Sequence, residues 1–412
     1  MTSSDLDAGL IGPETPLAAL TTMRVGGPAE QIVIANTRDE LVAHAIELWS
    51  TGEPWLLLGG GSNTVIHDDG YPGAVLLVRT SGLAEVPDAT LATGQVRLRV
   101  QAGHDWDALV AETVARGWSG IEALSGIPGL AGAAPVQNIG AYGQELSDVL
   151  HSIEFLDAAT HEVRELSAAE LELGYRDSVI KRGLEGVVLT IDLILSVAGE
   201  ESGQTAPPRG RHGTRDESER GSASAAAASA PVQYGQLATA LGVELGARVP
   251  IQHLRDSVLR LRADKGMVLN AADHDTWSSG SFFTNPIVTA RFASTLPDDA
   301  PRFHVAVVEY PDTIISLDDF AAGVPVQLPV TTNDRMVKLS AAWLIDHAGV
   351  PKGYSLPGSG AAVSSKHTLA ITNRGGASAA DVAELARFIV QRVQQEFGVI
   401  LVPEPNLYGL EL

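Results

Sequence analysis

The chain has 412 residues, enough for two or three domains with a sizeable core. Hydrophobic residues make up 45% and charged residues 19%, as in soluble globular proteins, and a formal net charge of −22 argues against nucleic acid as a main partner. The chain contains no cysteine, no apolar run of about 18 residues and no basic, apolar leader, so we expect a cytoplasmic protein without disulfides or membrane spans.

The first part of the chain alternates between helical and strand patterns. Apolar residues at helical spacing predict a helix over 39–49, and Asp105 is placed to cap a second helix over 105–115. Short apolar runs predict strands at 55–58, 74–78 and 187–197, and alternation predicts a half-buried strand over 96–100. Such a mixture indicates an α+β fold.

Two glycine-rich stretches follow or lie between these elements. The first, GGGSN, covers Gly59, Gly60, Gly61, Ser62 and Asn63, and the second reads GIPGLAGAAPVQNIGAYG over 126–143. Few of their side chains exceed a methyl group, so their backbone N–H groups can approach an anionic, flat ligand closely. Each stretch alone is typical of a surface turn, but together they favour a site for one long diphosphate cofactor. A Walker A sequence and a complete GxGxxG are both absent.

Residues 199–231 differ abruptly from their surroundings. They include no Val, Ile, Leu, Met, Phe, Trp or Tyr, so burial cannot offset the entropy of ordering them. We predict a disordered low-complexity insertion over 199–231, which divides the chain into one domain over 18–198 and another over 232–412.

The remaining candidate residues are polar or charged groups in short motifs. Arg176, in GYRDS, suits either a bidentate carboxylate clamp or a surface ion pair. Ser281 precedes two phenylalanines, but without a GxSxG motif a serine hydrolase is disfavoured. Glu404, between two prolines, is either a rigidly held acid or part of an exposed turn, and Tyr234 is placed to close over a ligand beside the insertion.

The last predicted helix begins at Ser378. Ser378 and Asp381 form a capping box, apolar residues follow at helical spacing, and Gly398 is the expected end. The eleven histidines show no metal-binding spacing, so we expect no metal.

Taken in order, seven motifs resemble the family of UDP-N-acetylenolpyruvoylglucosamine reductases, flavoproteins of peptidoglycan precursor synthesis. They are TMRVGGPA (22–29), GGGSN (59–63), SGIPGLAGAAPVQNIGAYGQE (125–145), YRDSVIK (175–181), GSFFTNP (280–286), AAWLID (341–346) and PEPNLYG (403–409). The position of Tyr234 in PVQYGQL is similar to that of the family's first type, in which a tyrosine folds over the substrate.

The resemblance implies an FAD-binding domain of the vanillyl-alcohol-oxidase type, made of two α+β subdomains, and a smaller C-terminal α+β substrate domain. It implies non-covalent FAD, because no histidine lies in either glycine-rich stretch, and NADPH as the hydride donor. Within the second stretch it implies cofactor contacts from a set of mostly small residues. They are Ser125, Gly126, Ile127, Pro128, Gly129, Gly132, Ala133, Asn138, Gly140, Tyr142 and Gly143.

The resemblance also implies the reaction, in which reduced flavin delivers hydride to an enolpyruvyl double bond and UDP-N-acetylmuramate is formed. Arg176 and Glu404 match the residues that stabilise the developing enolate, and Ser281 matches the residue that protonates the second carbon. Glu404 must then act as a protonated donor, so we expect burial to raise its pKa.

Substrate contacts are implied for Tyr234, Lys265 and Asn285. Some family members carry an arginine at the position of Asn406, so this chain departs from the family there and Asn406 is not expected to make that arginine's substrate contact. The alternatives are an FAD-linked oxidase of an alcohol or sugar, and a flavin-binding protein that has lost catalysis. We expect a monomer that acts on small molecules.

Overall fold

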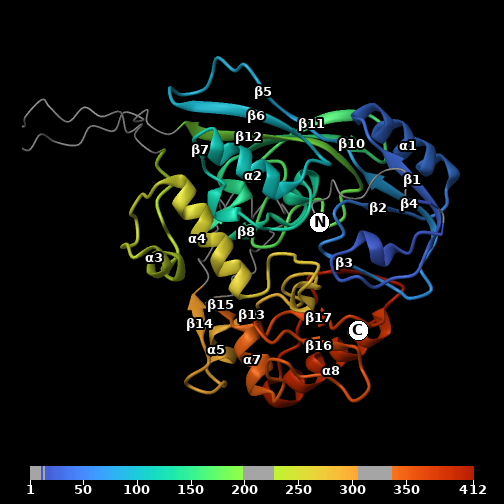
Figure 1. Cartoon of the computed structure of the whole chain (residues 1–412), viewed down its shortest axis with the longest axis vertical. Coiled ribbons are helices and arrows are strands. Elements are labelled where there is room, and N and C mark those ends of the chain that lie inside the picture. The colour runs from blue at the N-terminus through green and yellow to red at the C-terminus, as the bar shows by residue number, and fades with distance from the viewer. Residues whose placement is uncertain (1–10, 13, 198–226, 305–335) are drawn as a thin grey trace, which may run out of the picture.

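The computed structural model describes residues 11–12, 14–197, 227–304 and 336–412, and Figure 1 shows their arrangement. Every helix and strand predicted above is confirmed, and so is the mixed α+β architecture. The helices are α1 (Arg38–Thr51), α2 (Trp106–Ala115) and α8 (Ala379–Phe397). The strands are β2 (Trp55–Leu58), β4 (Tyr71–Val78), β6 (Gln95–Gln101) and β12 (Gly186–Val197).

The first sheet is small and parallel. Strand β1 (Ala29–Ala35) pairs with β4, which pairs with β2, so the order is β1-β4-β2. Helix α1 covers it, and its capping box joins Thr37 and Glu40 at the helix start. Because β2 ends at Leu58, the GGGSN stretch leaves this sheet at the carboxyl end of a strand.

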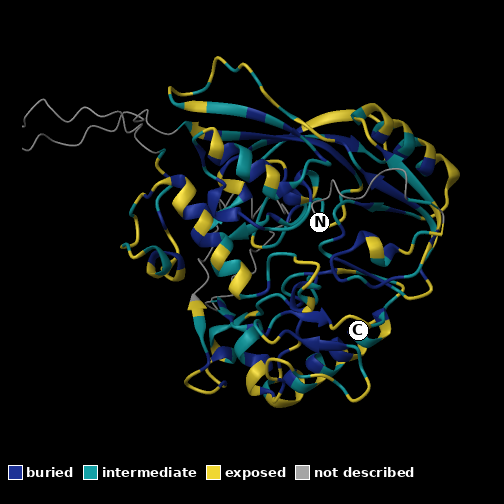
Figure 2. Ribbon diagram, viewed as in Figure 1, coloured by how far each residue is buried: buried dark blue, intermediate teal, exposed yellow. Residues whose placement is uncertain are grey.

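The second sheet is larger and antiparallel. Its order is β11-β10-β12-β6-β5, with β7 paired to β12, and the strands not yet named are β5 (Leu83–Glu85), β7 (Trp118–Ser119), β10 (Leu150–Asp157) and β11 (Val163–Ser167). Helix α2 packs on it and begins where the Asp105 side chain accepts the N–H of Ala108. Trp106 and Phe155 are among its fully buried side chains, and Figure 2 shows this core in dark blue.

The C-terminal unit has its own core. An antiparallel sheet contains β13 (Ile287–Thr289), β15 (Met336–Leu339) and β14 (Arg302–His304), and β16 (Ala361–Val363) forms a hairpin with β17 (Ile371–Asn373). The helices around them are α5 (Ala290–Ala293), α7 (Ala341–His347) and α8. The apolar face predicted for α8 is buried in this core.

A pair of helices connects the two halves. Helices α3 (Gly235–Leu241) and α4 (Ile251–Asp264) pack on each other, and Leu254 and Val258 share a core with Ala123 of the first half. This pair therefore lies against the first half of the chain, as Figure 1 also shows, although it follows the predicted boundary at 232.

Short elements bring distant motifs together. Strand β3 (Thr64–Ile66) pairs in parallel with β18 (Asn406–Tyr408), so GGGSN lies beside PEPNLYG. Strands β8 (Gly140–Ala141) and β9 (Gln144–Glu145) form a hairpin in the second glycine-rich stretch. Short 3-10 helices cover Leu17–Leu20, Glu122–Leu124, Ala131–Gln137, Leu146–Asp148 and His274–Thr276. None of the described helices is long and apolar enough to cross a membrane.

The end predicted for the disordered insertion needs correction. Residues 199–226 lie outside the described residues, but residues 227–231 are described and packed. Ser229 is fully buried, its N–H donates to Val249 O at 2.8 Å, and the N–H of Ala230 donates to Glu122 Oε1 at 2.6 Å. Alanine and serine bury little apolar area, so here backbone hydrogen bonds order a segment that composition alone marks as disordered.

Candidate active site

The two glycine-rich stretches touch each other. A Cβ on Gly60 would lie 2.9 Å from Gly129 Cα, and the Ser62 hydroxyl donates to Pro128 O at 3.0 Å. One stretch leaves the parallel sheet and the other follows α2, so both α+β parts contribute to one site. The sequence predicted that these stretches act together, and the structure places them in contact.

The glycines make this contact possible. Gly61 has φ +59°, and a Cβ there would lie 2.2 Å from Leu20 O; Gly129 has φ +125°, which favours glycine. A Cβ on Gly132 would lie 2.5 Å from Ala102 Cβ. We expected the missing side chains to leave room for a cofactor, but at these three positions they make room for other protein atoms.

Unpartnered polar atoms show what the site can accept. Among the described residues, buried Arg79 Nε, His104 Nε2 and Arg262 Nε have no hydrogen-bond partner. Arg79 NH1 donates to Gly59 O at 3.3 Å, His104 O accepts from Ala131, and a Cβ on Gly126 would lie 3.4 Å from Arg262 Nε.

Burial lowers the pKa of both arginines, so their charge lacks solvation there. Buried cations beside two glycine-rich stretches fit an anionic cofactor with polar edges.

Glu404 and Arg176 form an ion pair where the motifs converge. Arg176 Nε lies 3.3 Å from Glu404 Oε1, and Gln137 Nε2 donates to the same oxygen at 3.3 Å. Asn63 Nδ2 donates to Glu404 O at 3.2 Å. The side chains of Glu404 and Arg176 are 13% and 24% exposed, so the surface ion pair and exposed turn considered above do not describe them.

The electrostatics at Glu404 favour its protonated form. Burial raises the pKa of this carboxyl above its usual value, and the nearby cations Arg176 and Lys181 lower it to a smaller extent. The direction is the one that an acid donor needs. A protonated carboxyl beside a fixed guanidinium can hold an anion between two donors.

Arg176 is oriented by the second glycine-rich stretch. Its NH1 donates to Asn138 O at 3.3 Å and its NH2 to Gly140 O at 2.9 Å. The Asn138 side chain is itself buried, and it binds Glu145, Ser147 and Gly174 rather than facing a ligand. Asn138 therefore shapes the stretch and positions Arg176, a role that sequence reasoning did not assign.

Ser281 is brought to the site by a strand-like pairing. The N–H of Glu404 donates to Phe282 O at 2.9 Å, and the N–H of Thr284 donates to Val402 O at 3.1 Å. Ser281 thus lies at the end of the ladder that carries Glu404. Its Oγ lies 3.5 Å from His367 Nε2, a residue that the sequence did not single out.

The three predicted substrate residues lie on two sides of this site. Tyr234 is 45% exposed and packs edge-on to Tyr142, with ring centroids 5.7 Å apart. Lys265 Nζ lies 5.6 Å from the Tyr142 ring and donates to Gln236 at 2.8 Å. On the other side, Asn285 Oδ1 accepts the N–H of Ala341 at 3.0 Å, so part of its role is to hold the start of α7.

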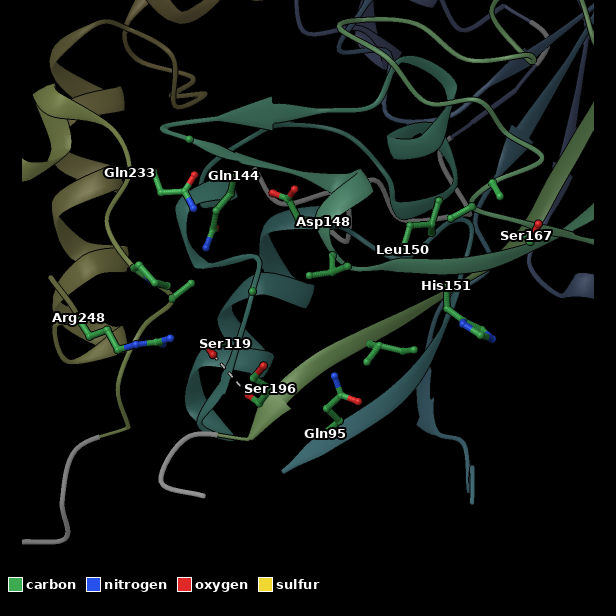
Figure 3. Close-up of a pocket in the computed structure, with 18 residues that line it drawn as sticks. Gln95, Ser119, Gln144, Asp148, Leu150, His151, Ser167, Ser196, Gln233 and Arg248 are labelled. Atoms are coloured by element: carbon green, nitrogen blue, oxygen red, sulfur yellow. Dashed lines mark hydrogen bonds between the residues drawn. The ribbon is translucent and has the colours of Figure 1, made fainter. Parts of the chain in front are cut away.

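Two cavities lie near these motifs in the described part of the chain, and of the three catalytic candidates Arg176 alone lines one of them. A cavity of about 640 Å³ is lined by Arg176 and Asn285 together with Tyr175, Lys181 and Pro403. A second cavity, of about 850 Å³, is lined by residues of the second glycine-rich stretch and of β10. Figure 3 shows its lining by Gln144, Asp148, Gln233 and Arg248. Charge and position favour the smaller cavity as the place for an anionic substrate.

Comparison with known proteins gives a consistent result. A family profile described as UDP-N-acetylenolpyruvoylglucosamine reductase, C-terminal domain, matches residues 272–408, and one described as FAD binding domain matches residues 29–167. A UDP-N-acetylenolpyruvoylglucosamine reductase of Leifsonia xyli subsp. xyli is 55% identical over 96% of this chain and 98% of its own.

Other relatives agree. A protein of the same name from Saccharopolyspora erythraea is 44% identical over 96% of this chain and 95% of its own. The crystal structure of a UDP-N-acetylenolpyruvylglucosamine reductase from Thermus caldophilus matches with a TM-score of 0.54 and 25% identity, over 96% of this chain and 97% of that one.

Proposed function

The chain belongs to the family of UDP-N-acetylenolpyruvoylglucosamine reductases, and we propose that Arg176, Ser281 and Glu404 carry out its chemistry on the substrate. It is an oxidoreductase of peptidoglycan precursor synthesis, with FAD as cofactor and NADPH as hydride donor. It reduces the enolpyruvyl group of UDP-N-acetyl-3-O-(1-carboxyvinyl)-glucosamine to give UDP-N-acetylmuramate. The expected FAD-binding domain is confirmed, and neither alternative considered above is needed.

The proposed cofactor site consists of Gly59–Asn63 and the stretch 125–143. The unpartnered buried groups of Arg79, His104 and Arg262 support this assignment, because a bound anion with polar edges would satisfy them. When bound, FAD supplies hydride that it has received from NADPH. Neither stretch contains a histidine, so we propose that FAD is held without a covalent bond.

Arg176 and Glu404 are proposed to make the substrate alkene accept a nucleophile. An enol ether is electron-rich, so hydride addition requires that negative charge be stabilised on the neighbouring carboxylate as it becomes an enolate. Arg176, fixed by two carbonyl oxygens, presents a permanent positive charge. Glu404, whose pKa is raised by burial, presents an O–H donor instead of a repelling carboxylate.

Ser281 is proposed to complete the reaction by protonating the second carbon. A serine hydroxyl is a weak acid, but the enolate of a carboxylate is a very strong base, so the transfer is downhill. Ser281 lies beside the Phe282–Glu404 hydrogen bond, which supports its placement next to the proposed enolate-binding pair.

Tyr234, Lys265 and Asn285 are proposed to bind the substrate. The exposed Tyr234 at the start of α3 can close over a ligand. Burial, and to a smaller extent the charge of Arg262, lowers the pKa of Lys265. Asn285 Nδ2 remains free to donate, since its only near partner among the described residues is Tyr175 Oη at 3.5 Å.

We further propose that the protein works as a monomer in the cytoplasm, with domains over 18–198 and 232–412. The nature of the reactants supports this setting, because NADPH and a UDP-sugar are small soluble molecules. The packing of α3 and α4 on the first half supports a direct contact between these two proposed domains.

The observation that carries the catalytic proposal is the buried Arg176–Glu404 pair beside both glycine-rich stretches. The test is Ser281→Ala in flavin-loaded protein, followed by stopped-flow absorbance. Flavin reduction by NADPH should be normal, and reoxidation by the enolpyruvyl substrate should slow by roughly 10²–10⁴-fold, as expected for loss of a positioned acid. Ser279→Ala, two residues away, is the matched control. Reoxidation of Ser281→Ala at the wild-type rate would contradict the assignment.

A further inference from the structure

One histidine contacts the proposed proton donor. His367 Nε2 lies 3.5 Å from Ser281 Oγ, although 86 residues separate the two in the chain. Among the described residues, no other side chain lies within hydrogen-bond distance of that hydroxyl. A group that touches a proton donor affects where the proton points and how stable the resulting anion is.

The backbone holds His367 firmly in this place. It lies in the connection between β16 and β17, where Ser364 Oγ accepts the N–H of Lys366 at 3.1 Å and of His367 at 3.2 Å. The N–H of Phe282 donates to Leu369 O at 2.7 Å. The connection is therefore hydrogen-bonded directly to the residue that follows Ser281, so the two side chains keep their relative position.

The imidazole is neutral at neutral pH. Burial, and to a smaller extent the positive charges of Lys265, Lys352 and Arg262, lowers the pKa of His367 to about 4. A neutral imidazole carries one N–H. If that hydrogen were on Nδ1, Nε2 would accept the serine proton and draw it away from the substrate. If it is on Nε2, the imidazole donates to Ser281 Oγ.

We propose that His367 is a positioning residue for Ser281, and that its Nε2–H donates to Oγ so that the hydroxyl hydrogen points to the substrate. This inference rests on the proposed role of Ser281. As the serine O–H bond breaks and the new C–H bond forms, the charge left on Oγ is stabilised by the Nε2–H, and the alkoxide then takes a proton from water. A donor to a developing anion forms a stronger hydrogen bond than one to a neutral oxygen.

The test compares two substitutions at His367 in flavin-loaded protein. His367→Gln keeps an amide N–H near the position of Nε2, whereas His367→Leu fills similar space without a donor. For His367→Leu we expect normal flavin reduction by NADPH. At saturating enolpyruvyl substrate, we expect reoxidation to be slower by about 10²-fold, which is the lower end of the range for loss of one hydrogen-bond donor to a developing charge. His367→Gln should recover most of that rate.

The Ser281→Ala background separates this proposal from the one on which it rests. There His367→Leu should slow reoxidation no further, because the oxygen that it supports is gone. If Ser281→Ala is slow but His367→Leu reoxidises at the wild-type rate, the role of His367 is overturned while that of Ser281 stands. Equal rates for His367→Leu and His367→Gln, or equal losses in reduction and reoxidation, would also overturn it. Wild-type reoxidation in Ser281→Ala would overturn both proposals.

Discussion

Glu404 is the residue whose behaviour depends most on its surroundings. Its pKa is raised in the folded protein, so the folded state binds this proton more tightly than the unfolded chain does. Its contribution to the free energy of unfolding is therefore fully present below the unfolded pKa, about 4.3, and is lost as pH rises through the higher folded pKa. Replacing the carboxyl by an amide removes this pH dependence.

We therefore predict that Glu404→Gln gains stability relative to the wild type as pH rises. Urea midpoints measured for both proteins at pH 5 and pH 8, without substrate, give the difference directly, and all other titrating groups cancel in the comparison. A difference that stays constant would show that the effects of burial and of Arg176 on the carboxylate cancel. One that shifts in favour of the wild type at pH 8 would show that Arg176 stabilises the carboxylate more than burial destabilises it.

The same residue should impose a pH dependence on the rate. Only the protonated carboxyl donates to the enolate, so reoxidation of reduced flavin by substrate should fall as pH rises through the raised pKa of Glu404. In Glu404→Gln, the amide donates at every pH, so reoxidation should be slower overall but lose that decline. Flavin reduction by NADPH, followed in the same stopped-flow experiment, is the internal control. A wild-type rate unchanged from acid to alkaline pH would contradict a protonated donor.

At the scale of elements, the start of α8 joins the two halves of the chain. The Ser378 side chain accepts the N–H of Asp381, and Asp68 from the first half accepts the N–H groups of Ala379 and Ala380 at 2.7 and 3.0 Å. Three N–H groups of the first turn are thus satisfied, two of them by a residue more than 300 positions away. A carboxylate there also suits the positive end of the helix dipole.

We predict that Asp68→Ala lowers the free energy of unfolding by about 1 kcal/mol, as for loss of a helix cap. Asp69→Ala is the matched control: its side chain is 95% exposed, and its removal should change stability by no more than about 0.5 kcal/mol. Denaturant titration of both variants checks the difference. Equal effects would mean that solvent replaces Asp68 at the helix start without cost.

The elements also show what sequence can and cannot predict. Local signals are sufficient to predict α2 and α8. Asp105, Ser378 and Gly398 cap these helices through hydrogen bonds to residues only three or four positions away in the chain. The ordered motifs predicted the family and hence Arg176 and Glu404. They did not predict that Gln137 donates to Glu404, since that bond depends on pairing β3 with β18.

Sequence reasoning missed Arg262 and His367, for different reasons. Arg262 lies in the last turn of α4, three residues before Lys265, which follows the helix end. This spacing was the one local signal that the two side chains lie on the same side. His367 has no local signal, because its contact with Ser281 exists only once the β16–β17 connection packs on the segment around Phe282.

At the scale of the whole molecule, an acidic chain gathers positive charge at one place. The net charge is −22, yet Arg176 and Lys181 line the smaller cavity, and Lys265 and Arg262 lie near Tyr142. NADPH and the UDP-sugar are both anionic, so this local field opposes the repulsion that they meet elsewhere on the surface.

The halves of the molecule are also connected through the end of the predicted insertion. Val197 pairs with Trp118, and a Cβ on the neighbouring Gly117 would lie 3.3 Å from Ala227 Cβ, so the two ends of the stretch 198–226 are close together. A short Gly/Ser linker can therefore join them.

We predict that replacing 200–224 by such a linker leaves flavin content and melting temperature near those of the wild type. Those residues include no large apolar side chain, and shortening a loop changes closure entropy by only about 1 kcal/mol.

Extending the same deletion to 231 should have a different result. It removes the N–H groups of Ser229 and Ala230, which leaves Val249 O without its donor and the fully buried Glu122 carboxylate with one donor, the N–H of Gly120, in place of two. A buried polar group that loses its partner costs about 1–3 kcal/mol, and more for a charged one, so the longer deletion should unfold at a clearly lower temperature. It should also lose flavin more readily, because Glu122 precedes the stretch 125–143 by only three residues and its backbone oxygen accepts a hydrogen bond from the Ser125 hydroxyl.

Thermal denaturation followed by flavin fluorescence measures both effects. Equal melting temperatures for the two deletions would show that residues 227–231 add nothing to stability, and a large loss with the shorter deletion would show that 200–224 contribute to the folded protein after all.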